Sequence, residues 1–122
     1  MADLTDREVR CHKYFLDPHI SLDSLSRKIG TNRTYLTQAI LWGSGCSFCT
    51  YVNQLRIDEV VQKGEQVLQS EDLLFNTALA CGYNNRRTFK RAFFREMGIS
   101  PADFVAQHKL LSLQQDNQQN SA

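Results

Sequence analysis

Residues 22–51, LDSLSRKIGTNRTYLTQAILWGSGCSFCTY, return in altered form at residues 74–104, LFNTALACGYNNRRTFKRAFFREMGISPADF. The two stretches align at an offset of 52 residues from Leu22 and Leu74, and of 53 residues from Tyr35 and Thr88. The second copy therefore has one extra residue between two helical segments, where a turn tolerates it. Each copy has the apolar spacing of a helix-turn-helix. One helix presented twice indicates a ligand with a repeating surface, and the DNA major groove is the obvious candidate.

The length and composition of the chain favour a small helical protein. Its 122 residues, 42% of them hydrophobic, suffice for one domain or for two small units that support each other. No apolar run approaches the ~20 residues of a membrane span, and residues 1–14 do not read as a signal peptide. The four cysteines are too few for a disulfide scaffold. We therefore expect a reduced, cytoplasmic setting and no membrane contact by this segment.

The charge is unevenly distributed although the formal net charge is only +1. Five basic residues and no acid lie between positions 84 and 95: Arg86, Arg87, Lys90, Arg91 and Arg95. The acids gather elsewhere, as at residues 3–8, 58–59 and 71–72. A local basic face on a nearly neutral chain is compatible with specific DNA binding and modest non-specific affinity.

Apolar spacing and capping signals predict an all-α fold. Expected helices cover residues 4–16, 22–29, 32–42, a long one from Ser47 to about Gly64, 73–81, one starting after Asn84 or Asn85, and one from Pro101. Ser21 and Ser100 are expected N-caps, and Gly30 is expected to make a tight turn. From Ser112 the chain is polar, and we expect a disordered tail.

The helix over residues 32–42 separates two faces. Leu36, Ala39 and Ile40 form its inner stripe, and Arg33, Thr34, Thr37, Gln38 and Leu41 fall on the other side. Thr, Gln and Arg side chains present the donors and acceptors that reading base edges requires. The same composition is found on any solvated helix face, so this helix alone does not decide for DNA.

Residues 74–101 resemble the C-terminal signature of the AraC/XylS family of bacterial transcription regulators. The residues that match are Leu74, Thr77, Ala78, Gly82, Tyr83, Asn85, Phe89, Arg91, Phe93, Gly98, Ser100 and Pro101. The first half is similar to the family through Leu22-x-x-Leu25-Ser26, Tyr35-Leu36, Gly45-x-Ser47-Phe48 and Tyr51-Val52-x-x-Leu55-Arg56-Ile57. The match covers roughly residues 4–108. Residues 31–36, with Tyr51-Val52-Asn53, are most similar to versions from Bacteroides-type bacteria.

The resemblance implies about seven helices and two helix-turn-helix subdomains joined by a linker helix. The implied boundaries are 1–46, 47–66, 67–111 and a tail over 112–122. It also implies a sequence-specific transcription regulator, of the activator type, that places two recognition helices in successive major grooves of double-stranded DNA. RNA polymerase and a sensor or dimerisation domain outside this chain are implied partners.

Carried over by position, the resemblance assigns contacts to both units. Thr34, Thr37 and Gln38 read bases in the first unit, with Arg33 beside them, and Arg86, Arg87, Lys90 and Arg91 do so in the second. The backbone amides at the capped helix starts near Ser47 and Asn85 are implied phosphate contacts.

Four departures from the family pattern bear on these expectations. Ser26 replaces a usual Ala, and Ile40 replaces a usual Phe and is expected to pack less well. Lys63-Gly64 stands where the family has paired leucines, which Val67-Leu68 would supply after an insertion of about three residues. Phe94 occupies a usual Lys position, where one phosphate contact is lost or passes to Arg95.

The cysteines and the tryptophan of the chain allow interpretations other than DNA binding. Cys46-x-x-Cys49 invites a metal or redox site, but no second tight pair of ligands exists, and we predict neither a metal nor a cofactor. No nucleophile–base arrangement stands out, so we predict no enzyme. Trp42 is interpreted as a hydrophobic plug between helices, with a DNA contact as the alternative. The alternative function is a helical protein-interaction module that has kept the fold and lost DNA binding.

Overall fold

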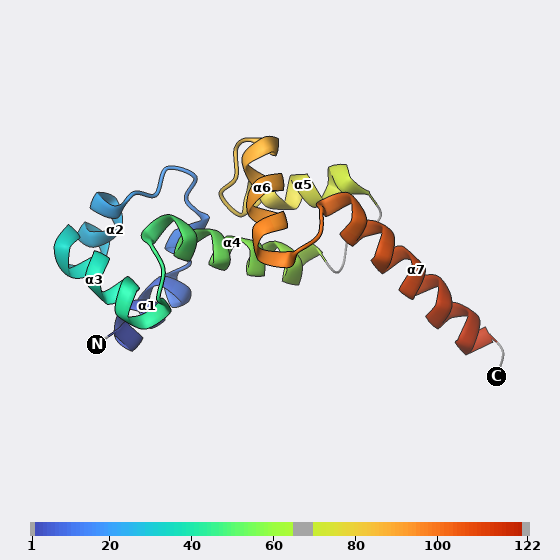
Figure 1. Cartoon of the computed structure of the whole chain (residues 1–122), viewed down its shortest axis with the longest axis horizontal. Coiled ribbons are helices and arrows are strands. Elements are labelled where there is room, and N and C mark those ends of the chain that lie inside the picture. Colours follow the sequence, from blue (N-terminus) through green and yellow to red (C-terminus); the bar gives the residue numbers. More distant parts are fainter. Residues whose placement is uncertain (1, 65–69, 121–122) are drawn as a thin grey trace.

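The computed structural model describes residues 2–64 and 70–120, in which helices are joined by short turns (Figure 1). The elements are α1 (Ala2–His12), the short 3-10 helix η1 (Tyr14–Leu16), α2 (Leu22–Lys28), α3 (Arg33–Ser44), α4 (Phe48–Gly64), α5 (Glu71–Ala80), α6 (Arg86–Met97) and α7 (Pro101–Asn120). The described part thus holds seven α-helices and no strand, which confirms the predicted all-α fold. None of these helices combines the length and the apolar character needed to cross a lipid bilayer.

Side-chain caps determine where most helices begin. Ser21, Asn32, Ser70 and Asn85 each accept a hydrogen bond from the backbone N–H three residues later, at the starts of α2, α3, α5 and α6. Ser100 Oγ does the same for Asp103 N at 3.1 Å, just before Pro101 opens α7. These bonds satisfy amides that a helix start otherwise leaves unpaired. The predicted caps at Ser21 and Ser100 are confirmed, and Asn85, not Asn84, caps α6.

The first predicted helix is shorter in the structure than its sequence suggests. Apolar spacing predicts one helix over residues 4–16, but α1 ends at His12 and Lys13 adopts a left-handed backbone with φ 52°. This break turns the chain so that Lys13 Nζ lies 2.9 Å from the Glu59 carboxylate on α4. It also allows Phe15 to enter the core, where it is buried. A tertiary contact therefore overrides the local helical pattern.

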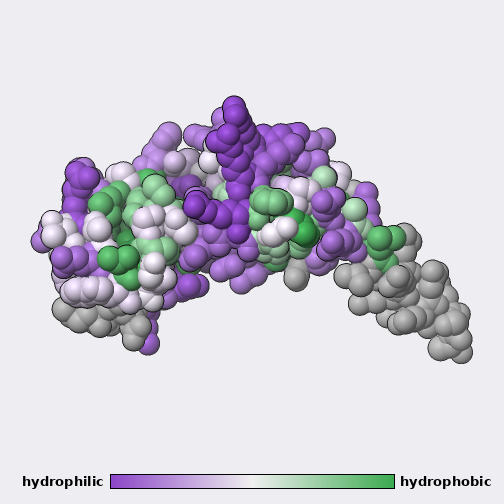
Figure 2. Space-filling model, viewed as in Figure 1, coloured by the Kyte–Doolittle hydropathy of each residue, from purple (hydrophilic) through white to green (hydrophobic). Residues whose placement is uncertain are grey.

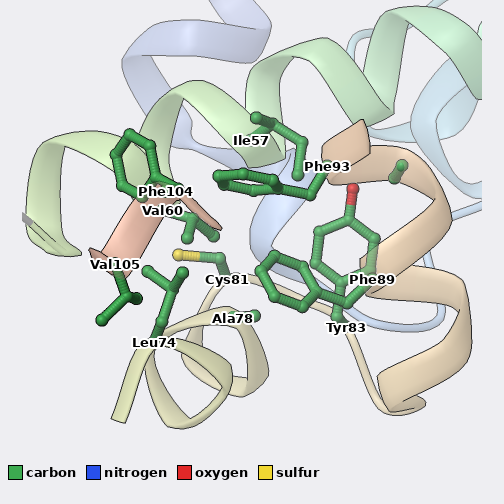
Figure 3. Close-up of a cluster of buried hydrophobic side chains, with 11 residues drawn as sticks. Ile57, Val60, Leu74, Ala78, Cys81, Tyr83, Phe89, Phe93, Phe104 and Val105 are labelled. Carbon is green, nitrogen blue, oxygen red and sulfur yellow. The ribbon is translucent and has the colours of Figure 1, made fainter. Parts of the chain in front are cut away.

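Two hydrophobic cores share the linker helix α4. The first core holds Tyr51, Val52 and Leu55 of α4 together with buried side chains of α1, η1, α2 and α3. The second holds Ile57 and Val60 of α4 with buried side chains of α5, α6 and α7 (Figure 3). Ile40, expected to pack less well than a Phe, is 3% exposed in the first core. Because one helix belongs to both cores, the units support each other, as their small size requires.

Arg56 ties the two units together beside α4. Its guanidinium donates to the carbonyl oxygens of Phe15 at 2.7 Å and Asp17 at 2.8 Å, both in the first unit. The same guanidinium lies over the ring of Tyr83 in the second unit, 5.4 Å from the centroid. Burial lowers the pKa of Arg56, although nearby Tyr83 and Asp17 oppose that shift. One half-buried cation therefore joins α4, η1 and the turn after α5.

Helix α7 continues to Asn120, whereas the sequence predicts a disordered segment from Ser112. Figure 1 shows its C-terminal half lying away from the other helices. No Pro or Gly follows Pro101, and the segment from Ser112 contains four Gln, a residue that favours helix, so no helix-breaking residue stops it.

Glycine at the end of α4 offers a first test of the linker. The structure ends α4 at Gly64, close to the predicted end, while Val67-Leu68 lie outside the described residues. We expect Gly64→Ala to lower the free energy of unfolding by about 1 kcal/mol, because glycine at a helix end commonly adopts positive φ, where alanine is strained. Thermal melts measure the change. Gly45→Ala, at φ 73° with open space around it, is the reference for such strain. A higher midpoint for Gly64→Ala would show that the helix runs on.

Candidate nucleic-acid interface

Helix α3 presents a polar face to solvent in the first unit. Leu36, Ala39 and Ile40 are buried beneath it, as predicted. On the opposite side Arg33, Thr34, Thr37 and Gln38 are exposed, and with Leu22 of α2 they line one shallow hollow. The structure therefore brings together the four residues of the first unit that the sequence singles out. Their hydroxyl, amide and guanidinium groups supply both donors and acceptors to whatever fills the hollow.

Helix α6 presents a basic face in the second unit. Phe89, Ala92 and Phe93 are buried, and edge-on contacts join the rings of Phe89 and Phe93 at 5.6 Å between centroids. The opposite side exposes Arg86, Arg87, Thr88, Lys90, Arg91, Phe94 and Arg95. Figure 2 shows hydrophilic side chains gathered over the upper end of α6. The buried apolar side of α6 thus fixes the direction of five cationic side chains.

The predicted basic residues of α6 fall into two kinds. Arg86 Nη2 donates to Asp72 Oδ1 at 2.9 Å, and its guanidinium lies 4.7 Å from the centroid of the Phe75 ring. Lys90 Nζ lies 3.3 Å from Glu71 Oε1. Arg87 and Arg91 have no acidic partner within 4.0 Å in the described part of the chain. Two cations are therefore partly neutralised by α5, and two face solvent with their full charge.

Arg33 in the first unit has a similar partner. Its Nε lies 3.2 Å from Asp23 Oδ1, and both side chains are half exposed or more. Such exposed pairs contribute little to stability, typically under 1 kcal/mol. They do restrict where the guanidinium points.

The side chains of Ser47 and Asn85 are engaged in helix caps. Ser47 Oγ accepts from Thr50 N at 3.4 Å, and Asn85 Oδ1 accepts from Thr88 N at 3.1 Å. The other backbone N–H groups in the first turns of α4 and α6 therefore remain available to bind an anion. The helix dipole also favours negative charge there.

A groove between α4 and α6 adds residues that the sequence does not single out as contacts. It is lined by Asn53, Thr88, Arg91, Ala92, Phe94 and Arg95. Asn53 Oδ1 accepts from Tyr83 Oη at 2.7 Å, so its amide is held in place. The spacing of Arg91 and Arg95, four residues apart, indicates one shared helix face. No local pattern indicates Asn53, because its position depends on how α4 packs.

Trp42 contradicts its prediction. A plug between helices would be buried, but Trp42 is 76% exposed near the C-terminal end of α3. The inner stripe of α3 ends at Ile40, and Trp42 follows the exposed Gln38 by four residues, so its indole lies on the solvent-facing side of the helix. Phe94, at the usual Lys position, is likewise 59% exposed.

The four cysteines differ in how deeply they are buried. Cys81 is buried, Cys11 and Cys49 are exposed, and Cys46 is half-buried with its Sγ 3.1 Å from Ser44 Oγ. Among residues 2–64 and 70–120, no three His, Cys, Asp or Glu side chains group closely enough to hold a metal ion.

Two helix-turn-helix units, each with an outward polar helix and both packed on one shared helix, define a bipartite DNA-binding protein. A family model described as a helix-turn-helix domain matches residues 25–107. The chain belongs to this family, and more narrowly to the AraC-type DNA-binding transcription regulators.

Known regulators and solved structures resemble the chain over most of its length. It is 25% identical to the regulatory protein SoxS of Salmonella typhimurium over 95 residues, covering 78% of this chain and 84% of SoxS. A Listeria innocua protein of unknown function has a similar structure, with a TM-score of 0.68 at 26% identity, covering 86% of this chain and 96% of that one. The C-terminal domain of the response regulator AraT from Geobacillus stearothermophilus shares the fold, with a TM-score of 0.68 at 22% identity, covering 87% and 84%.

Proposed function

We propose that the chain binds one face of double-stranded DNA, with α3 and α6 in successive major grooves. The observation that carries this proposal is the pair of exposed polar helices held by one shared helix. Helix α4 has 17 residues and is therefore about 25 Å long. It separates two units that must span the ~34 Å between adjacent major grooves on one face.

In this proposal the two recognition helices make different contacts. Thr34, Thr37 and Gln38 read base edges in one groove, and Arg87 and Arg91 do so in the other, where arginine forms paired hydrogen bonds with guanine. Arg33, Arg86 and Lys90 are the other DNA-binding side chains of the two recognition helices in this proposal. First-turn amides near Ser47 and Asn85 hold phosphates and fix the register.

The regulatory role proposed for the chain is activation of transcription in the bacterial cytoplasm. The implied partners are RNA polymerase and a sensor or dimerisation domain outside this chain. The support is the AraC-type family and the regulatory proteins that the chain resembles.

The salt dependence of binding tests the proposal. Each phosphate neutralised by Lys or Arg contributes a slope of about −0.9 to log K against log salt on duplex DNA. Arg95, which reads no base in this proposal, gives roughly −1 by itself, and phosphate contacts from all six basic side chains (Arg33, Arg86, Arg87, Lys90, Arg91 and Arg95) would give roughly −5. We expect a slope between these values by fluorescence anisotropy on a duplex selected from a random pool. If no selected or genomic duplex binds at low salt, the protein-interaction module becomes the better function.

A further inference from the structure

The first arginine of each recognition helix is held by the helix that precedes it. Arg33 is the first residue of α3 and pairs with Asp23, the second residue of α2. Arg86 is the first residue of α6 and pairs with Asp72, the second residue of α5. The same arrangement therefore occurs in both units.

The two arrangements are not simple copies in the sequence. Asp23 and Phe75 occupy matching positions of the repeat, 52 residues apart. In the second unit the Phe75 ring supports the Arg86 guanidinium, while the acid comes from Asp72, three residues earlier. Different residues thus produce the same restraint, which argues that the restraint itself matters to the protein.

We propose that Asp23 and Asp72 are positioning residues that direct Arg33 and Arg86 towards base edges and away from phosphates. This inference rests on the DNA binding proposed above. A guanidinium has five N–H donors, so one bond to an aspartate leaves donors for a base. The carboxylate beside it repels phosphate and lowers the local positive charge.

The Asp23–Arg33 and Asp72–Arg86 ion pairs are too weak to add much to the stability of the fold, but they are strong enough to affect DNA specificity. An exposed ion pair changes a free energy by only about 0.2–1 kcal/mol, so DNA is able to displace it. Phe75 adds a second restraint on Arg86, because cations lie favourably over aromatic faces. Asp23 and Asp72 also interact favourably with the dipoles of α2 and α5, because they lie in the first turns of these helices. This stabilisation of α2 and α5 does not require an arginine at the start of the next helix.

The test compares two duplexes for each variant: the selected site, and a mixed duplex of random sequence. We expect Asp72→Asn to raise affinity for the random duplex by about two- to fivefold. Its preference for a guanine in the α6 half of the selected site should fall by up to about tenfold. Asp23→Asn should act on the other half of the site. Asp72→Glu, which keeps the carboxylate, should retain most of the preference.

The control is Asp103→Asn on α7, which removes the same charge from an exposed acid that has no ion pair in the described residues. Thermal melts establish that each variant folds. An unchanged preference in folded Asp72→Asn, or an equal change in Asp103→Asn, would overturn the inference while leaving the proposed function intact. Failure of the wild-type protein to bind any duplex would instead defeat the proposed function, and the inference with it.

Discussion

Gly82→Ala is expected to destabilise the protein by about 3 kcal/mol, since backbone strain of ~1–3 kcal/mol adds to a steric clash. Gly82 has φ 106° and is buried in the turn between α5 and α6. A Cβ there would lie 2.8 Å from Arg56 Nε and 3.0 Å from the backbone oxygen of Leu16. Relief of that clash would move Arg56 away from the carbonyls of Phe15 and Asp17, which it bonds.

Urea unfolding of the intact chain measures this effect. Gly98→Ala is the matched control, because Gly98 also has positive φ, 76°, but a Cβ there meets nothing within 4 Å. Its loss should be about 1 kcal/mol, from strain alone. Equal losses for the two variants would show that the contact between Arg56 and the Gly82 turn does not hold the units together.

Arg91→Ala is expected to weaken binding to the selected duplex by about 5- to 150-fold, the range for losing a paired arginine–guanine contact of ~1–3 kcal/mol. The loss should be confined to sequences with the preferred base in one half of the site. Arg87→Ala should behave in the same way, because no acid within residues 2–64 and 70–120 pairs with either side chain. Thr37→Ala, which removes one hydroxyl, should affect the other half less.

A panel of duplexes with single base changes in each half-site measures the preference. Arg7→Ala is a suitable control, since it removes an exposed arginine of α1 that lies outside both recognition helices. If Arg91→Ala lowers affinity equally for all duplexes, the residue holds the DNA backbone and reads no base.

The sequence by itself determined the helices and the faces they present. Ser21, Asn85 and Ser100 are caps in the structure because a cap depends on residues only three positions apart. Phe89 and Phe93 are buried and Arg87 and Arg91 exposed because spacing of about 3.6 residues separates two faces of a helix. The repeat and the family signature likewise predicted the two units and the shared helix between them.

Only the tertiary structure decided the details that depend on residues far apart in the chain. Lys13 breaks the first helix near Glu59, 46 residues away, and Arg56 reaches Phe15 across 41 residues. Periodicity predicts that Arg86 is exposed, but its pairing with Asp72 depends on how α5 packs against α6. Trp42 is exposed because it lies four residues after the exposed Gln38, on the solvent-facing side of α3. Local patterns carry helix and face preferences, whereas the partner of each side chain depends on packing between segments that the sequence separates.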